Sequence, residues 1–379
     1  MKYLIIGGGV AGTACAEELR KAGADAEITI VSEENHPLYS RVLLPHYAMD
    51  KVTREKCFLK QIEWYAEQNI EIIMGQRAVK LDAENKFVEL DDARELPYDK
   101  LVLATGTEPR LETGEPRGVG YFWTIDDTDH LIKLLGEPGH KQAVIHGGGF
   151  IACEFLNLFA YHELATTVVI RGEHFWNRIL VPEMAEFFMG HLEKQGVKVL
   201  TNVKKFEVMG KSEVKAVRTD GAETKCSVLG VAIGNEIDFG WLKEAGIEIG
   251  SGIKTNEYLE TSVPDVYAIG DVVESHDPVV DRQYMAGNWG RAMMMGRTVA
   301  KTMLGEKTEF RHVSSYAINV LGLDVTFIGD TDKAAAERVE IEEKEQGIAQ
   351  KYYRNKKMVG TAIFGKGFDR NKLTQEIGK

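Results

Sequence analysis

The chain has 379 residues, of which 44% are hydrophobic and 27% are charged. Because a single hydrophobic core stops growing at about 250–300 residues, this length predicts two or three domains. The formal net charge is −12 and the lysines and arginines gather in no basic run, which argues against nucleic acid as a partner.

The start of the chain and its cysteines bear on the cellular compartment. The first expected strand, Tyr3–Ile6, begins almost at the initiator methionine, and no stretch approaches about 18 apolar residues without charges. We therefore expect no signal peptide, no membrane span and a cytoplasmic location. The cysteines are widely spaced without a CxxC pair and the ten histidines are scattered, so we expect reduced thiols and no metal site. The cysteines are Cys15, Cys57, Cys153 and Cys226.

The N-terminal segment has the pattern of a βαβ unit. An apolar strand (Tyr3–Ile6) leads through a glycine turn into a helix (Val10–Ala22), and a second apolar strand follows (Ala26–Val31). The turn reads Gly-Gly-Gly-Val-Ala-Gly from position 7 and fits GxGxxG. A strand, a glycine turn and a helix in this order predict a dinucleotide-binding fold.

Each glycine of this turn has a physical role in binding a dinucleotide. Gly7 permits the tight turn, Gly9 lets a pyrophosphate approach the backbone, and Gly12 allows close helix–strand packing. The helix N-terminus offers free N–H groups and partial positive charge to the phosphates. Glu33 lies 21 residues past Gly12, just after the second strand, where a carboxylate can accept hydrogen bonds from an adenosine ribose.

The same plan recurs about 140 residues later. Here a strand (Ala143–Ile145), a glycine turn, a helix (Phe150–Tyr161) and a second strand (Thr167–Ile170) follow one another. The turn reads Gly-Gly-Gly-Phe-Ile-Ala from position 147, and the alanine at its end is a replacement that the fingerprint tolerates. The chain therefore predicts two nucleotide-binding units.

The nucleotide preference of the second unit stays open. Its second strand ends in Ile-Arg-Gly-Glu, where an NAD site usually has an acid. Arg171 could pair with the 2′-phosphate of NADP, Glu173 could reach a ribose, or the site could have lost its nicotinamide nucleotide. Phe175 and Trp176 either stack on such a nucleotide or fill its pocket.

Two further segments make the pattern specific. Leu101–Thr107 contains Ala-Thr-Gly, and Val263–Asp271 is a short strand that ends in Gly-Asp. With four motifs in this order over nearly the whole chain, the sequence resembles the flavoproteins with two dinucleotide-binding domains, the superfamily of the pyridine nucleotide–disulfide oxidoreductases. The resemblance implies an α/β fold with two Rossmann-like domains of the glutathione-reductase type, FAD and NAD(P)H as cofactors, and a small C-terminal α+β domain.

The resemblance also implies domain boundaries. We expect a discontinuous FAD-binding domain of residues 1–112 and 245–309, an NAD(P)-type domain of residues 113–244 and a C-terminal domain of residues 310–379. The stretch Glu112–Gly120 is the expected linker. Strand-like segments at Val325–Ile328 and Met358–Phe364, around the charged stretch Lys333–Lys344, support the α+β character of the last domain.

Cofactor contacts follow from the matched motifs. Asp271 resembles the family aspartate that contacts the ribityl and phosphate part of the flavin, and Ala104–Gly106 resembles the segment that crosses beside the cofactor. The implied FAD contacts are Gly7, Gly9, Val10, Ala11, Gly12, Glu33, Glu34, Arg41, Ala104, Thr105, Gly106, Gly270, Asp271 and Trp289. The implied NAD(P) contacts are Gly147, Gly149, Phe150, Ile151, Arg171 and Gly234.

The segment Pro37–His46 indicates the branch of the superfamily. Disulfide reductases carry a CxxxxC pair here, and related oxidases, peroxidases and coenzyme A disulfide reductases carry one cysteine, but this chain has none between Cys15 and Cys57. Without a thiolate beside the flavin there is no route for disulfide exchange, so we expect no disulfide reductase and no cysteine-dependent peroxidase or oxidase. The pattern Tyr-Ser-Arg-x-Leu-Leu is instead similar to NADH:rubredoxin reductases, oxygenase-coupled ferredoxin reductases and the flavoprotein part of nitrite reductases.

Two residues are catalytic candidates by this resemblance. Some members of the branch pair a lysine near the flavin with a glutamate on the helix of the second domain. Glu154 matches the glutamate, whereas the best candidate for the lysine position is His46. A histidine titrates near neutral pH, so we expect proton handling at the flavin to differ from that in the relatives, unless His46 is a loop residue away from the flavin.

These features predict an FAD-dependent NAD(P)H:acceptor oxidoreductase. Hydride would pass from NADH or NADPH to the flavin, and electrons would pass on to a rubredoxin, a ferredoxin or an iron–sulfur subunit. The alternatives are a flavin-bearing electron-transfer subunit that no longer binds NAD(P)H, an oxidase that uses O2, and a nonenzymatic nucleotide sensor. The short C-terminal domain leaves a monomer, a homodimer and a subunit of a complex equally open.

Overall fold

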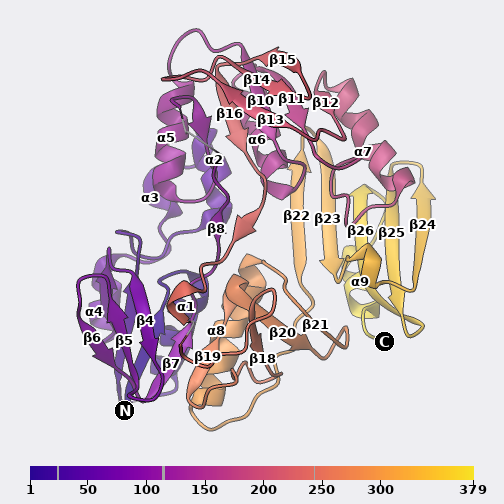
Figure 1. The fold of residues 1–379 in the computed structure, drawn as a ribbon. Helices are drawn as coiled ribbons and strands as arrows, with labels where there is room; N and C mark the ends of the chain where they lie inside the picture. Colours follow the sequence, from indigo (N-terminus) through magenta and orange to yellow (C-terminus); the bar gives the residue numbers. More distant parts are fainter. Residues whose placement is uncertain (24, 113–115, 243) are drawn as a thin grey trace. The chain divides into compact units, whose positions relative to one another are not determined.

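A computed structural model gives the structure of residues 1–379 with the exception of residues 24, 113–115 and 243 (Figure 1). The chain forms two compact units. Residues 113–115 of the expected linker lie outside the described part. Unit 1 comprises Met1–Ser40, Arg54–Thr107 and Ile237–Ser314, and unit 2 comprises Arg41–Thr53, Glu108–Glu236 and Ser315–Lys379.

Unit 1 is built on a five-stranded parallel sheet in the order β19-β7-β1-β2-β3. Its strands are β1 (Lys2–Ile6), β2 (Glu27–Ser32), β3 (Glu71–Met74), β7 (Lys100–Leu103) and β19 (Val266–Ala268). The order reverses direction at β1, whose neighbours β2 and β7 lie on opposite sides. In open α/β sheets, ligands bind beyond the carboxyl ends of the strands at such a switch point.

The remaining elements of unit 1 are helices and two small sheets. The helices are α1 (Val10–Lys21), α3 (Arg54–Cys57), α4 (Ile62–Glu67) and α8 (Trp289–Met303), with short 3-10 turns at Gly240–Leu242 and Gly270–Val272. The small sheets are β4-β5-β6 (Ala78–Asp82, Phe87–Leu90, Glu95–Pro97) and β18-β20-β21 (Ile253–Thr255, Val273–Asp277, Arg282–Tyr284).

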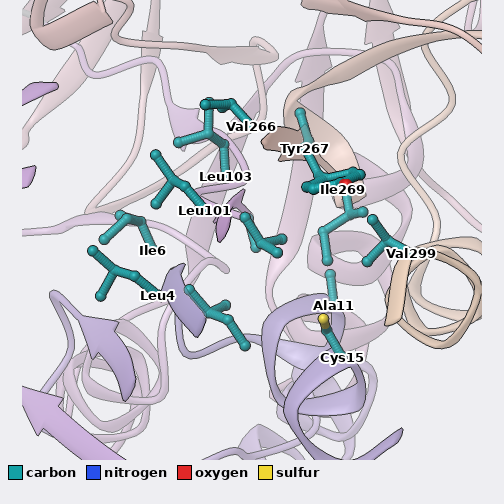
Figure 2. Close-up of a cluster of buried hydrophobic side chains, with 14 of the residues drawn as sticks. Leu4, Ile6, Ala11, Cys15, Leu101, Leu103, Val266, Tyr267, Ile269 and Val299 are labelled. Atoms are coloured by element: carbon teal, nitrogen blue, oxygen red, sulfur yellow. The ribbon is translucent and has the colours of Figure 1, made fainter. Parts of the chain in front are cut away.

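The core of unit 1 lies between its sheet and the helices α1 and α8. Figure 2 shows Leu4 and Ile6 of β1 and their neighbours on β7 and β19, together with Cys15 of α1 and Val299 of α8. A parallel sheet covered by other elements has strands that read as apolar runs, as these do. Helix α8 packs closely on α1, since a Cβ on Gly296 would lie 2.2 Å from the carbonyl oxygen of Ala11. Burial of Cys15 in this core raises the pKa of its thiol well above the ordinary value, which keeps it unreactive.

Unit 2 repeats the plan with a parallel sheet in the order β12-β11-β10-β16-β9. Its strands are β9 (Val119–Gly120), β10 (Gln142–His146), β11 (Ala165–Val169), β12 (Lys198–Leu200) and β16 (Val228–Val231), and its larger helices are α5 (Ile125–Leu135), α6 (Phe150–Tyr161) and α7 (Pro182–Lys194). Strand β10 is flanked by β11 and β16 just as β1 is flanked by β2 and β7. The predicted repetition of the nucleotide-binding fold is thereby confirmed.

Smaller elements complete the nucleotide-binding part of unit 2. Strands β13-β14-β15 (Phe206–Met209, Ala216–Thr219, Ala222–Lys225) form one antiparallel sheet, and β8 (Glu108–Pro109) pairs with β17 (Asn235–Glu236). A 3-10 turn at Arg41–Leu43 and the helix α2 (Leu44–Ala48) also belong to this unit. No helix of the described residues combines the length and the apolar character that crossing a bilayer requires.

The C-terminal part of unit 2 is an antiparallel sheet in the order β22-β23-β26-β25-β24, drawn in orange to yellow in Figure 1. Its strands are β22 (Ser315–Val320), β23 (Leu323–Gly329), β24 (Arg338–Lys344), β25 (Gly347–Arg354) and β26 (Lys357–Gly365); a 3-10 turn (Lys333–Ala335) and the helix α9 (Arg370–Glu376) accompany them. The predicted α+β character is confirmed. The charged stretch at 333–344 contains β24, which forms one edge of this sheet. Charged side chains on an edge strand discourage its pairing with another chain.

Candidate functional site

The first glycine loop has the geometry of a pyrophosphate cradle. Gly7 has φ +121°, and a Cβ there would lie 2.1 Å from the carbonyl oxygen of Ala104. A Cβ on Gly12 would lie 2.1 Å from the carbonyl oxygen of Gly7, so both positions require glycine. Around Gly9, by contrast, a Cβ would meet no atom within 4 Å. This open space stands at the N-terminus of α1, where the free N–H groups and the helix dipole favour phosphate.

The neighbouring strand end closes one side of this loop. The N–H of Ala104 donates to the carbonyl of Ile6 over 2.7 Å, which holds the Ala-Thr-Gly segment beside the glycine loop. Gly106 has φ +71°, a left-handed conformation that favours glycine and turns the chain away from β7. The predicted residues Val10, Ala11, Thr105 and Gly106 therefore stand at the carboxyl ends of β1 and β7 in unit 1.

The two acidic residues after β2 have separate partners. The carboxylate of Glu33 lies 2.9 Å from Nη1 of Arg77, whose Nη2 lies 3.2 Å from Asp238. Glu34 accepts a hydrogen bond from the hydroxyl of Tyr39. The side chain of Glu33 is 58% exposed, so its carboxylate can still receive ribose hydroxyls while Arg77 holds it. Arg77 is a residue that no sequence motif indicated.

The Gly-Asp turn stands in front of helix α8. Gly270 has φ +80°, and its N–H donates to the sulfur of Met295 over 3.3 Å. Asp271 faces Gly287, where a Cβ would lie 3.2 Å from a carboxylate oxygen of Asp271. Helix α8 begins at Trp289, beside this turn, and Asn288 caps it by accepting the N–H of Arg291 over 3.0 Å. The predicted Gly270, Asp271 and Trp289 are thus brought together in unit 1.

Arg291 serves this region as a buried anchor. Its guanidinium donates to Asp277 over 2.8 Å and to Ser275 over 2.9 Å, and it lies 4.7 Å from the centre of the Phe310 ring. Arg291 and Asp277 are each 1% exposed. A buried pair of this kind is costly to break, because the remaining charge loses its partner.

We expect Arg291→Met to destabilise the protein by about 3–5 kcal/mol, since it leaves the Asp277 carboxylate buried and uncompensated. Urea unfolding followed by tryptophan fluorescence measures the effect. The double variant Arg291→Met, Asp277→Val is the control and should recover part of the loss. If the single variant unfolds at the wild-type urea concentration, the ion pair does not stabilise unit 1.

The second glycine loop repeats the geometry of the first. Gly147 has φ +132°, and a Cβ there would lie 2.0 Å from the carbonyl oxygen of Ala232. At Gly149 a Cβ would meet no atom within 4 Å, so the N-terminus of α6 is open like that of α1. Ala152, in the place of the third glycine, is completely buried. The loop therefore keeps the form of a pyrophosphate cradle despite the alanine.

A cavity of about 220 Å³ adjoins this loop within unit 2. Its walls come from four segments: Pro109–Arg110, Tyr121–Trp123, Gly149–Ile151 and Val231–Asn235. The predicted contacts Gly149, Phe150, Ile151 and Gly234 all line it. An apolar cavity with a few polar groups, placed at the carboxyl ends of parallel strands, is the expected form of a nucleotide site.

Arg41 stands beside one wall of this cavity. Its guanidinium donates to the carbonyl oxygen of Trp123 and lies 4.9 Å from the centre of the Trp123 ring. Arg41 belongs to unit 2, whereas the first glycine loop belongs to unit 1. The contact orders the Trp123 wall of the cavity.

The aromatic pair after β11 is part of the core. Phe175 is fully buried and Trp176 is 6% exposed. The Trp176 ring lies 4.8 Å from that of Phe188 and 5.2 Å from that of Phe327 on β23. These side chains fill the space between the second nucleotide-binding fold and the C-terminal sheet. Arg171 and Glu173, in contrast, are both exposed just beyond β11.

Glu154 lies on α6, one turn after Phe150, and has a displaced pKa. Burial raises the pKa of its carboxyl to about 7, while the Lys51 cation and a hydrogen bond from Tyr316 act in the opposite direction. His46 is exposed on α2, and its carbonyl accepts the N–H of Lys51 over 2.9 Å. The cation that acts on Glu154 is therefore Lys51, five residues after the histidine that the sequence suggested.

Sequence reasoning missed Arg77, Lys51 and Tyr316. Arg77 meets Glu33 from a loop 44 residues away, and Tyr316 meets Glu154 from a different part of unit 2. No local motif marks either residue. Lys51 had a weak signal, since it is the first lysine after the Tyr-Ser-Arg segment.

The fold and the two glycine loops define a protein with two dinucleotide-binding folds joined to a small antiparallel sheet. A family model for pyridine nucleotide-disulphide oxidoreductases matches residues 1–296. The chain belongs to this family, as its motifs predicted. The description of the family, an oxidoreductase that works with a pyridine nucleotide, agrees with the predicted class of protein.

Several curated relatives are similar over most of the chain. It is 29% identical to nitrite reductase [NAD(P)H] of Bacillus subtilis, over 100% of this chain and 47% of that protein. It is 30% identical to NADH oxidase of Methanocaldococcus jannaschii, over 85% of this chain and 74% of that protein. It is 28% identical to the ferredoxin–NAD(+) reductase component of the biphenyl dioxygenase system of Paraburkholderia xenovorans, over 86% of this chain and 81% of that protein. The chain thus spans about half the length of the nitrite reductase.

A solved structure confirms the fold. The covalent putidaredoxin reductase–putidaredoxin complex matches with a TM-score of 0.92 at 23% identity, over 100% of this chain and 93% of that chain. The predicted α/β architecture with two Rossmann-like parts and a C-terminal part is therefore confirmed.

Proposed function

We propose that the chain is an FAD-dependent NAD(P)H:acceptor oxidoreductase, which takes hydride from NAD(P)H and delivers electrons to a redox protein of the ferredoxin or rubredoxin type. The carrying observation is the pair of glycine loops with the same open geometry, the second of which adjoins the cavity in unit 2. Two nucleotide cradles in one chain fit a reaction between two nucleotide cofactors.

In this proposal the residues of unit 1 hold FAD. Gly7, Gly9 and Gly12 shape the pyrophosphate cradle at the N-terminus of α1, Glu33 receives the ribose hydroxyls, and Asp271 holds the ribityl part. Bound FAD would supply the redox chemistry, since its isoalloxazine accepts hydride and releases electrons singly.

The residues of unit 2 hold the hydride donor. Gly147 and Gly149 receive the pyrophosphate, and the wall formed by Phe150 and Trp123 excludes water from the nicotinamide. Glu154, whose pKa of about 7 lets it exchange a proton near neutral pH, holds a proton one helical turn after Phe150. His46 stays a candidate for proton exchange at the surface of α2.

The redox-protein acceptor is supported by the relatives. One relative is a ferredoxin–NAD(+) reductase component, of which the match covers 81%, and another is a nitrite reductase. The first of these names pairs a reductase with a ferredoxin, and this pairing supports an acceptor of the same class here. The acidic net charge of −12 requires a local basic patch for an acidic acceptor.

An anaerobic titration of the purified yellow protein with NADH and then NADPH tests the hydride half-reaction. We expect a stoichiometric amount of one of them to bleach the flavin absorbance. If neither nucleotide bleaches it while dithionite does, the proposal is wrong.

A second candidate is suggested by Ala152, which replaces the third glycine of the second loop, together with Arg171. The chain covers 47% of the nitrite reductase and 49% of the assimilatory nitrate reductase electron transfer subunit of Bacillus subtilis. In this candidate the chain is a flavin-bearing electron-transfer subunit of a larger complex and no longer binds NAD(P)H. Rapid turnover of the isolated chain with NAD(P)H and a one-electron acceptor argues against this candidate, and reoxidation by air alone identifies the oxidase alternative.

The exposed Arg171 allows a prediction about the nucleotide. If it pairs with the 2′-phosphate, Arg171→Ala should raise the KM for NADPH about 10- to 100-fold and leave the KM for NADH nearly unchanged, because a hydrogen bond to a charged group contributes about 1.5–3 kcal/mol. Glu173→Gln is the control and should affect NADH more than NADPH. Equal changes for both nucleotides in the Arg171 variant would rule out 2′-phosphate recognition by this side chain.

A further inference from the structure

The first strand of the C-terminal sheet is fastened to the helix that follows the second glycine loop. The side chain of Asn157 on α6 donates to the carbonyl of Asn319 over 2.7 Å and accepts the N–H of Leu321 over 3.0 Å. His191 on α7 makes a further hydrogen bond to the carbonyl of Val320 over 3.0 Å. These contacts fix β22 against α6, so that the side chains of β22 hold constant positions beside that helix.

Tyr316 of β22 contacts two residues on the first turns of α6. Its ring centre lies 4.3 Å from that of Phe150, at an interplanar angle of 56°. Phe150 and Glu154 are four residues apart on one face of α6, and the Tyr316 hydroxyl acts there on the Glu154 carboxyl, whose pKa it lowers. Phe150 lines the cavity of unit 2, so one tyrosine contacts both a wall of the cavity and the carboxyl one helical turn farther along α6.

We infer that Tyr316 is a positioning residue of the hydride-donor site, which orients the Glu154 carboxyl and holds the Phe150 wall of the cavity. The inference rests on the proposed function and deepens it. It also gives the small C-terminal sheet a role, because that sheet carries a residue on which the nucleotide site of unit 2 depends.

The direction of the effect follows from the groups around Glu154. Burial raises the pKa of its carboxyl to about 7, and the Lys51 cation and the Tyr316 hydroxyl lower it. Burial and the neighbouring carboxylate raise the pKa of Tyr316 far above its ordinary value, so the hydroxyl stays protonated and remains a donor. The titratable groups on the elements packed against α6 are His46 and Tyr47 on α2, Lys51 just after it, His146 on β10 and Tyr316 on β22.

Tyr316→Phe removes the hydroxyl and keeps the ring against Phe150. Without the donor, the Glu154 carboxylate loses a favourable hydrogen bond, and the pH at which it is half protonated should rise by about 0.5–1 unit. An infrared pH titration of the full, FAD-loaded protein measures this midpoint from the carbonyl band of the protonated carboxyl. Glu154→Gln identifies the band by its loss.

The same shift should occur in the pH profile of flavin reduction by NAD(P)H. We expect the inflection of the rate to move upward with the infrared midpoint in Tyr316→Phe, with little change in KM. Tyr316→Leu also removes the ring and should raise KM. Tyr353→Phe on β25, a tyrosine of the same sheet whose ring faces Arg338, is the matched control and should change neither profile.

The outcomes separate the inference from the proposed function. Infrared midpoints that coincide in the wild type and Tyr316→Phe overturn the inference, even if NAD(P)H reduces the flavin. If the infrared midpoint shifts in Tyr316→Phe but the pH profile of flavin reduction does not, the role of Tyr316 in hydride transfer is overturned. If neither NADH nor NADPH reduces the flavin of the wild-type protein, the proposed function itself is overturned. The role of Tyr316 at a hydride-donor site is then overturned as well.

Discussion

Replacing Gly9 by valine should give a folded protein that no longer retains FAD. The backbone at Gly9 has φ −70° and ψ −172°, an extended conformation that any residue adopts. A Cβ there would meet no atom of the protein within 4 Å, so the valine side chain occupies only the space in front of α1. If two charge-assisted hydrogen bonds to the pyrophosphate are lost, FAD binding weakens by about 10²- to 10⁴-fold.

The test is the ratio of flavin to protein after purification and after dialysis against added FAD. Circular dichroism and the unfolding temperature show whether the variant is folded. Gly7 is unsuitable for this experiment, because a substitution there would disturb the loop itself. Its φ of +121° strains any other residue, and a Cβ would lie 2.1 Å from the carbonyl oxygen of Ala104. A folded Gly9→Val protein with wild-type flavin content would mean that the pyrophosphate binds elsewhere.

Replacing Gly149 by valine should preserve the bound flavin and strongly weaken its reduction by NAD(P)H. Gly149 has φ −120° and ψ −159°, again an extended backbone, and a Cβ there would meet no atom within 4 Å. The valine would block the N-terminus of α6, where the second pyrophosphate is proposed to bind. If two charge-assisted hydrogen bonds to this pyrophosphate are lost, we expect the KM for NAD(P)H to rise by about 10²-fold or more.

Gly149→Val and Gly9→Val are controls for one another, since the loops have the same geometry and lie in different units. In Gly149→Val, dithionite should still bleach the flavin, while NADH and NADPH should bleach it far less. Unchanged reduction by either nucleotide would show that the second loop does not bind the hydride donor, and the flavin-subunit alternative would then gain support.

The sequence by itself determined the two nucleotide-binding folds and the order of their parts. Apolar runs that lead into glycine turns predicted β1 and β10 correctly, because both the burial of a parallel strand and the left-handed backbone of Gly7 and Gly147 depend on residues adjacent in the chain. The same holds for the Gly-Asp turn, whose Gly270 has φ +80°. The resemblance to the family rested on these motifs, and the family model confirms it.

Only the tertiary structure decided which side chains act on one another. It placed Lys51 in the field of Glu154, and it brought Tyr316 from the C-terminal sheet to the same carboxyl. It also assigned Trp176 to the core, although its sequence position beside the nucleotide site left two alternatives. Such contacts depend on the packing of segments far apart in the chain, and the pKa of a buried carboxyl depends on all the charges and hydrogen bonds around it, so no local pattern contains them.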